Sequence, residues 1–166
     1  MKNKDKLKLI LKDNIYLKEI NANLPRILSL IDIDITNKSF GTTDRLFWAW
    51  KLKDFSNCTG QGMINGLCRL WVNKLWPYNT KKEKFFQRIS HLIIGAQKLT
   101  RKDGSLEEAF PYEGSYCVTA LVAYDHLVAY ELIKDEIDYS LKKKNGKILL
   151  EDGLFIYCRL MKRMHL

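Results

Sequence analysis

The fold is decided by residues 115–133, whose sequence is SYCVTALVAYDHLVAYELI. Drawn as a helix, this stretch is apolar on almost every face, at Val118, Leu121, Val122, Tyr124, Leu127, Val128 and Leu132. Such a helix is tolerated only where neighbouring elements surround it. We therefore expect residues 115–133 to form the central helix of the protein.

On both sides of this stretch, apolar residues recur at helical spacing, and the alternation typical of strands is nearly absent. Further helices are expected at 5–20, from an N-cap at Asn23 with Pro25 in the first turn, at 61–76 with Pro77 as its stop, from a capping box at Thr80 to Gln97, and at 150–164. Residues 36–59 are expected to form a loop around a short helix, and residues 98–114 a polar connection. The sequence thus predicts an all-α fold, an α/α-hairpin array of about six helices.

Composition limits the class of protein. The chain has 166 residues, 46% of them hydrophobic, and a net charge of +9 from 28 Lys and Arg against 19 Asp and Glu. This length is enough for one core without disulfides, so we expect a single domain over residues 1–166. The apolar stretch 116–130 contains Asp125 and His126 and is shorter than the ~20 residues that span a bilayer, so no membrane span is expected. The N-terminal stretch lacks the pattern of a signal peptide, and we expect a cytoplasmic protein.

Cysteines and histidines are scattered rather than paired. Cys58, Cys68, Cys117 and Cys158 form no spacing that holds zinc, and each is expected to be a packing residue. His91 is expected to be solvated. His126 is expected to be a satisfied buried histidine or, with Asp125, a polar pair that faces a cavity. No metal site and no cofactor are expected.

Gln97 is followed by RKDGS at 101–105 and then by an expected helix that opens with SYCVTA at 115–120. This pattern resembles the repeat of the α/α-toroid superfamily, which includes terpenoid cyclases, six-hairpin glycosidases and polysaccharide lyases. The strings DRLFWAWK at 44–51 and DGSLEEAFPYE at 103–113 also resemble toroid proteins associated with bacterial surface-polysaccharide synthesis. The resemblance covers roughly residues 41–133 and implies about half of a toroid, either truncated or completed by a second chain.

Carboxylates in the 98–114 connection are the first candidate site. Two carboxyl groups in unlike environments can divide acid and base roles in glycosidic chemistry, and we assign such roles to Glu107 and Glu113, with Asp103 beside them. Two other interpretations stay open. Asp103 suits a turn beside Gly104, and Ser105 with Glu108 has the form of a capping box.

Aromatic and cationic residues that lie close in sequence are the second candidate site. Tryptophan and tyrosine faces can cover the apolar face of a sugar, and arginine can grip a carboxylate or phosphate. The predicted substrate-binding residues are Asp44, Arg45, Trp48, Trp50, Lys51 and, from the carboxylate loop, Tyr112. The structural alternative is that both tryptophans pack on a neighbouring helix and Asp44 caps a short one.

Taken together, these features predict a toroid-like protein that binds or acts on an anionic glycan or glycolipid intermediate. If it is an enzyme, the resemblance implies a glycoside hydrolase or polysaccharide lyase. The alternative is a non-catalytic helical scaffold or binding module, with a homodimer if the toroid is completed between chains. An isoprenoid cyclase is the third hypothesis, although Leu106 replaces the tryptophan of the cyclase repeat and the acidic motifs are missing. No signature of specific nucleic-acid binding is present.

Overall fold

The computed structural model describes residues 14–43, 58–108 and 113–136. The chain divides at Leu30 into two compact units, Met1–Leu30 and Ile31–Leu166. The described residues are mostly helical, which confirms the all-α class, but they contain four α-helices rather than about six, and no toroid. The helix predicted at 150–164 lies outside the described residues. The single domain over 1–166 stays a prediction.

The first unit contains helix α2, Ile15–Ser29. Asn14 caps it, because its side-chain oxygen accepts a hydrogen bond from the Leu17 amide at 3.1 Å. The prediction of a helix end near Ile20 and a new start at Asn23 is wrong. The helix continues through both Asn23 and Pro25, and the Asn23 amide donates to the carbonyl of Glu19 at 2.9 Å. Asn23 therefore bonds to the preceding turn of the same helix instead of starting a new one.

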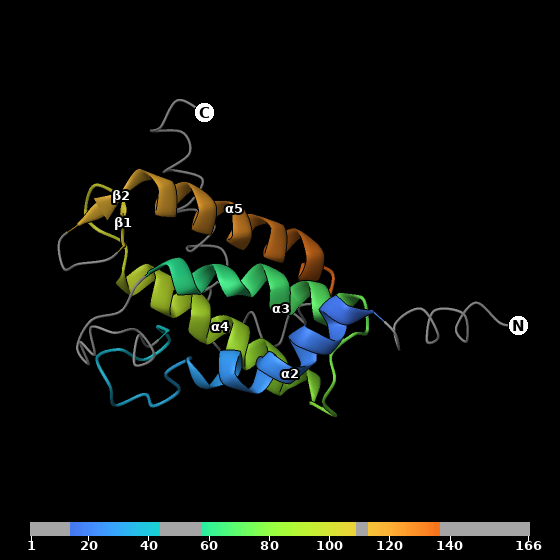
Figure 1. The fold of residues 1–166 in the computed structure, drawn as a ribbon. Coiled ribbons are helices and arrows are strands. Elements are labelled where there is room, and N and C mark those ends of the chain that lie inside the picture. The colour runs from blue at the N-terminus through green and yellow to red at the C-terminus, as the bar shows by residue number, and fades with distance from the viewer. Residues whose placement is uncertain (1–13, 44–57, 109–112, 137–166) are drawn as a thin grey trace, which may run out of the picture. The chain divides into compact units, whose positions relative to one another are not determined.

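The second unit contains three helices, α3 (Met63–Val72), α4 (Lys82–Lys98) and α5 (Tyr116–Ile133), and the short 3-10 helix η1 (Cys58–Gly62). Figure 1 shows α3 between α5 and α4. Helix α3 packs along α5, and η1 contacts all three helices. Asn65 contacts Asp125 near the start of α3, and Trp71 contacts Glu136 near its end, so α3 and α5 run in the same direction.

Both ends of the α3–α4 connection differ from prediction. Helix α3 ends at Val72, before Pro77, in a turn where Lys74 has φ 57° and the Leu75 amide donates to the carbonyl of Leu70 at 2.8 Å. Thr80 does not cap α4. Lys81 is the N-cap without a side-chain bond, and the Thr80 hydroxyl instead accepts from the indole Nε1 of Trp76 at 3.0 Å. A half-buried indole N–H needs an acceptor, and Thr80 provides it.

Two short strands, β1 (Leu106–Glu107) and β2 (Gly114–Ser115), form an antiparallel pair that the sequence did not predict. Strand β1 leads from the turn after α4, and β2 leads into α5, whose N-cap is Ser115 with its hydroxyl accepting from the Val118 amide at 3.3 Å. The position of the predicted central helix is thus confirmed to within one residue. The pairing escaped prediction because strands of two residues have no alternation to detect.

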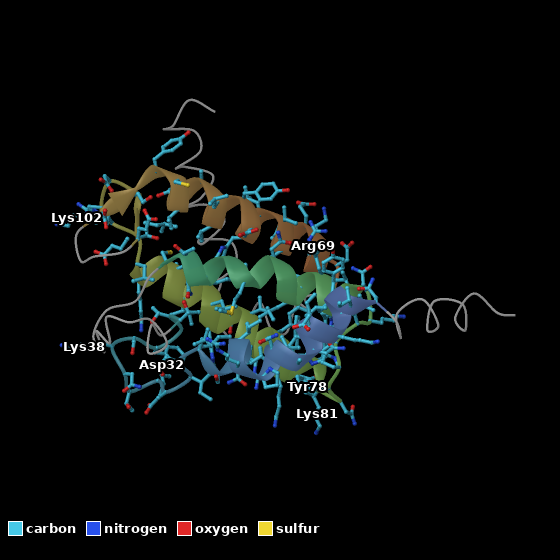
Figure 2. The ribbon with its side chains drawn as sticks, viewed as in Figure 1. Asp32, Lys38, Arg69, Tyr78, Lys81 and Lys102 are labelled. Carbon is cyan, nitrogen blue, oxygen red and sulfur yellow. The ribbon has the colours of Figure 1, made fainter. Side chains whose placement is uncertain are left out.

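A turn-rich segment precedes η1 and is organised by Asp32, which Figure 2 labels. Its carboxylate accepts hydrogen bonds from the Asp34 amide at 2.9 Å, the Ser39 hydroxyl at 2.6 Å and the Asn37 side chain. The chain then returns beside its start, where Ile31 bridges Thr43. The carboxylate of Asp32 therefore shapes this turn.

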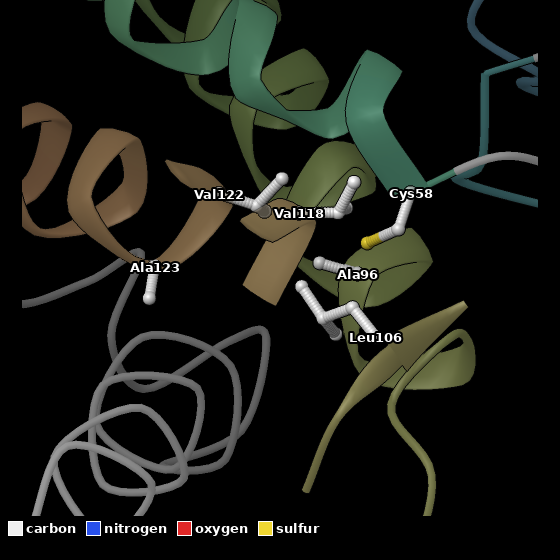
Figure 3. Close-up of a cluster of buried hydrophobic side chains, with 6 residues drawn as sticks. All are labelled: Cys58, Ala96, Leu106, Val118, Val122 and Ala123. Atoms are coloured by element: carbon white, nitrogen blue, oxygen red, sulfur yellow. The ribbon is translucent and has the colours of Figure 1, made fainter. Parts of the chain in front are cut away.

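Small apolar side chains close the core at one end of the three helices (Figure 3). This cluster consists of Cys58, Ala96, Leu106, Val118, Val122 and Ala123, with Leu99 packed against it. Leu106 reaches it from β1, and its amide donates to the hydroxyl of Thr119 at 2.9 Å. The core thus joins the hairpin to η1, α4 and α5.

Helix α5 is buried on one side only, which corrects the prediction that neighbours surround it. Val118, Val122 and Ala129 are buried, whereas Leu121 is 56% exposed and Tyr124 is 58% exposed. Within the described residues, α5 is the one helix long and apolar enough to cross a membrane. Core helices of soluble proteins pass the same test, so this finding is weak evidence of a membrane span.

Candidate functional site

Asp103 is a turn residue in the structure. Its carboxylate accepts hydrogen bonds from the amide of Ser105 at 3.0 Å and from the Ser105 hydroxyl at 2.7 Å, and Gly104 between them has φ 91°. These bonds from Ser105 hold the pKa of Asp103 below its ordinary value. The turn interpretation of Asp103 is therefore confirmed. The capping box of Ser105 and Glu108 is wrong, because β1 rather than a helix follows Ser105.

The strand register places the glutamates. Glu107 lies opposite Gly114, and the amide of Glu108 donates to the carbonyl of Glu113 at 3.3 Å. Because neighbouring residues of a strand point to opposite faces, Glu108 and Glu113 share one face and Glu107 lies on the other. The structure therefore puts Glu108, not Glu107, beside Glu113.

The second predicted site, Asp44, Arg45, Trp48, Trp50 and Lys51, lies outside the described residues, as does Tyr112. The described chain stops at Thr43 and resumes at Cys58, and both residues are buried. An added Cβ at Gly60 would clash with the side chain of Thr43, so the two ends of the described chain lie side by side. The residues that flank the predicted site are thus held together in the core.

Gln61 is the polar centre of this junction. It is fully buried, and its amide nitrogen donates to the carbonyls of Gly41 at 3.1 Å and Leu92 at 2.7 Å. Its amide oxygen accepts from the backbone N–H of Thr43 at 3.0 Å. Buried amides are stable only when bonded in this way, so Gln61 has a structural role that its place in a predicted helix did not reveal.

The two described histidines are both buried in part or in full. The Nδ1 of His126 lies 2.9 Å from the carbonyl of Val122, and burial lowers the pKa of His126 to about 4. The prediction of a buried His126 is confirmed. His91 is not solvated as predicted, because its ring packs against Phe40 with centroids 4.7 Å apart. Burial, assisted by the positive charge of Arg88, lowers the pKa of His91.

The described cysteines separate into two kinds. Cys58 and Cys68 are buried, as predicted, and desolvation raises the pKa of each thiol to about 12. Cys117 is exposed on α5, which corrects the prediction that it is a packing residue. The thiols of Cys58 and Cys68 are protonated at neutral pH and cannot act as nucleophiles.

Asp125 connects α5 to the start of α3. Its carboxylate accepts a hydrogen bond from the Asn65 side chain at 2.8 Å, and Asn65 in turn accepts from the Nε of Arg69 at 2.9 Å. An added Cβ at Gly62, the N-cap of α3, would lie 2.6 Å from the other carboxylate oxygen. Asp125 thus puts a negative charge at the positive end of the α3 dipole, which is a structural use of the charge.

An aromatic stack at the α3–α4 connection was not predicted as a site. Trp71 stacks on Phe85 with centroids 4.2 Å apart, Trp76 meets Phe85 edge-on at 5.2 Å, and Tyr78 meets Trp76 edge-on at 6.0 Å. The rings run from the buried Phe85 through the half-buried Trp76 to Tyr78, which is 41% exposed. The spacing of these aromatics along the sequence was the available signal.

Lysines lie at the exposed end of this stack. Lys81 and Lys82 lie at the start of α4, and both are exposed. Figure 2 shows Lys81 on the same end of the α3–α4 pair as Tyr78. The Nζ of Lys82 lies 5.7 Å from the ring centroid of Phe86. Within the described part of the chain, neither lysine has a carboxylate within ion-pair distance. We call Trp76, Tyr78, Lys81 and Lys82 the aromatic–lysine surface.

Residues 14–43, 58–108 and 113–136 contain no group of three or more His, Cys, Asp or Glu that could hold a metal ion. Comparison of the chain with protein-family models, with curated proteins and with solved structures finds no match.

Proposed function

We propose that the protein is a helical module that binds an anionic glycan or the glycan part of a glycolipid. The observation that supports this most is the aromatic–lysine surface, where a stack of rings reaches solvent beside two lysines. The sequence resemblance to toroid proteins of surface-polysaccharide synthesis favours a glycan among the possible anions.

The rings of this surface suit a sugar. Trp76 and Tyr78 present apolar faces with a polar edge, and the Trp76 Nε1 is held by Thr80, so the indole is fixed before a ligand arrives. A fixed ring loses little conformational freedom on binding. The apolar face of a pyranose can therefore stack here at low entropic cost.

The lysines favour an acidic ligand. Lys81 and Lys82 stand at the first turn of α4, where the helix dipole favours anions and opposes cations. Glu83 provides one carboxylate in the same turn, and a carboxylate or sulfate of a bound glycan would add a second anion beside the two lysines. The net charge of +9 adds a long-range attraction for polyanions.

The geometry of the β1–β2 hairpin, which carries the predicted catalytic carboxylates, favours binding over catalysis as the function of the protein. Asp103 is bonded to Ser105, and the register separates Glu107 from Glu113, so the predicted acid and base are not on one face. We therefore propose no reaction at this hairpin. Glu108 and Glu113, which share a face, are the pair to substitute if hydrolysis is detected.

The half-toroid architecture and the site at 44–51 belong to the same proposal. Helices α3, α4 and α5 are joined by two successive antiparallel connections, which is the arrangement of an α/α-hairpin array. Arg45, Trp48 and Trp50 follow the junction at Thr43, which lies at the η1 end of α3, and they stay a separate predicted binding site. A cytoplasmic location and the absence of a membrane span stay predictions.

The experiment is calorimetric titration with an oligouronate, a neutral malto-oligosaccharide and oligothymidylate. We expect saturable binding of the oligouronate and no binding of the neutral sugar. The variants Tyr78→Ala and Lys81→Gln/Lys82→Gln should each weaken binding about three- to tenfold, the range expected for exposed contacts.

Matched controls exist in the described chain. Tyr16→Ala removes another exposed tyrosine, and Lys38→Gln/Lys102→Gln removes two other exposed lysines. If the control variants bind the oligouronate with unchanged affinity, the result supports binding at the aromatic–lysine surface. An equal loss of affinity in the surface variants and the control variants would mean that only the net charge attracts the ligand, which would contradict a specific surface. Tighter binding of oligothymidylate than of any glycan would also contradict the proposal.

A further inference from the structure

One stripe of α5 faces solvent and has the spacing of a helix–helix interface. Its members are Cys117, Leu121, Tyr124, Val128 and Glu131, which we call the α5 seam. The intervals between them are four and three residues in alternation, the pattern by which two helices pack with knobs into holes. Four of the five are exposed, and Val128 is half-buried. The buried side of α5, at Val118 and Val122, is already used by the core.

The charge of the seam differs from that of the rest of the chain. Helix α5 contains no Lys or Arg, although the whole chain has 28. Its acids are already engaged, Asp125 with Asn65, and Glu131 with Lys134 at 2.5 Å. Two copies of a chain with a net charge of +9 repel each other, and the seam is a face on which they can meet with little repulsion, because Glu131 neutralises the neighbouring Lys134.

We propose that the α5 seam is the interface of an antiparallel homodimer. The seam is centred on Tyr124, so antiparallel packing brings Glu131 of one copy to the start of the other copy's α5, near Cys117. A carboxylate is favoured there because helix N-termini are positive, and the two helix dipoles then oppose each other. Parallel packing would instead put the two Glu131 carboxylates together.

The size of the seam sets the expected affinity. Five residues on each helix are far fewer than the roughly 20–30 a side of stable interfaces, so we expect a weak dimer that forms at high micromolar concentration. A membrane surface is the competing occupant, because α5 is apolar enough to span one. An acidic residue and no cation on the seam make an anionic bilayer the less suitable partner.

The first test measures mass by analytical ultracentrifugation over low to high micromolar concentrations. The wild type should pass from monomer to dimer, and Leu121→Lys/Tyr124→Lys should stay monomeric. The matched control is Ile33→Lys/Ile35→Lys, which makes the same change at two exposed apolar residues outside α5 and should dimerise as the wild type does. Circular dichroism establishes that each variant is folded.

The second test determines the direction of the helices by cross-linking. Positions 117 and 131 of one helix are about 21 Å apart, too far for a disulfide within one copy. In an antiparallel pair, Glu131→Cys should form a disulfide between its new thiol and Cys117 of the other copy on mild oxidation. A disulfide between two Cys117 residues in the wild type would indicate a parallel pair instead.

Three results would overturn the proposal. They are a wild type that stays monomeric at high micromolar concentration, a dimer weakened equally by the seam and control variants, and a monomer that binds neutral lipid vesicles through Leu121 and Tyr124. Glycan titration of the monomeric variant separates this proposal from the proposed function, since the aromatic–lysine surface does not include α5.

Discussion

Gly66 and Gly95 show at the scale of single residues how much the surroundings of a side chain matter. Both lie inside helices, and sequence alone treats them alike. A Cβ at Gly66 would meet nothing within 4 Å, whereas one at Gly95 would clash with the carbonyl oxygen of Gly41 and lie 2.5 Å from the amide nitrogen of Gln61. Gly95 therefore allows the turn at Gly41 to cross α4.

The two alanine variants should have opposite effects. Gly66→Ala is expected to stabilise the protein by about 0.5–1 kcal/mol, because alanine is the better helix former. Gly95→Ala is expected to destabilise it by about 2–3 kcal/mol, because backbone must move to make room. Urea unfolding followed by circular dichroism measures both. Equal effects of the two substitutions would contradict the close crossing of Gly41 and Gly95.

His126 makes stability depend on pH. Its pKa is about 4 in the folded protein against an ordinary value of 6.5, so the unfolded chain binds a proton first as the pH falls. Its stabilising contribution is complete above about 6.5 and is lost as the pH falls toward 4, up to ~3 kcal/mol.

The variant His126→Leu isolates this effect. We expect the stability difference between pH 7 and pH 4.5 to be smaller in the variant than in the wild type, as measured by urea unfolding at both values. Other titrating groups, His91 among them, remain in both proteins and cancel in the comparison. An unchanged pH dependence would mean that His126 is not buried as a neutral ring.

At the scale of elements, the sequence predicted where helices exist better than where they end. The helix at 115–133 was predicted because almost all of its faces are apolar, and its predicted start at Ser115 coincides with the N-cap of α5. The end of α3 was missed, because Lys74 adopts a conformation that sequence patterns assign to glycine. The break near Asn23 was wrong because Asn23 and Pro25, which are typical of a helix start, both lie inside α2.

The end of α3 gives a prediction at this scale. Lys74→Gly should stabilise the protein by about 0.5–1 kcal/mol, because a lysine at positive φ is strained and glycine is not. Asn73→Gly is the control, since Asn73 has φ −82° and its side chain donates to the carbonyl of Arg69. The Asn73→Gly substitution should destabilise the protein, because this hydrogen bond is lost. Thermal unfolding distinguishes the two, and a loss of stability in Lys74→Gly would contradict the terminating turn.

At the scale of the whole molecule, the spacing of apolar residues predicted the helical class, and tertiary structure determined the roles of polar residues. Asp103 was a candidate acid because carboxylates cluster near it, yet Ser105 uses it in a turn. Gln61 was not predicted to have a role, yet it forms hydrogen bonds with three backbone groups of the core. The aromatic–lysine surface depends on which rings touch, and no sequence period indicates that.

The most direct test of the account is an NMR titration of the four tryptophan indole N–H signals with an acidic oligosaccharide. Trp76 lies in the aromatic–lysine surface, and Trp71 lies deeper in the same stack. We predict a saturable shift of the Trp76 signal and a smaller shift for Trp71, and in Lys81→Gln/Lys82→Gln both shifts should need an oligosaccharide concentration about three- to tenfold higher. An unmoved Trp76 signal at saturating oligosaccharide would contradict the proposed binding surface.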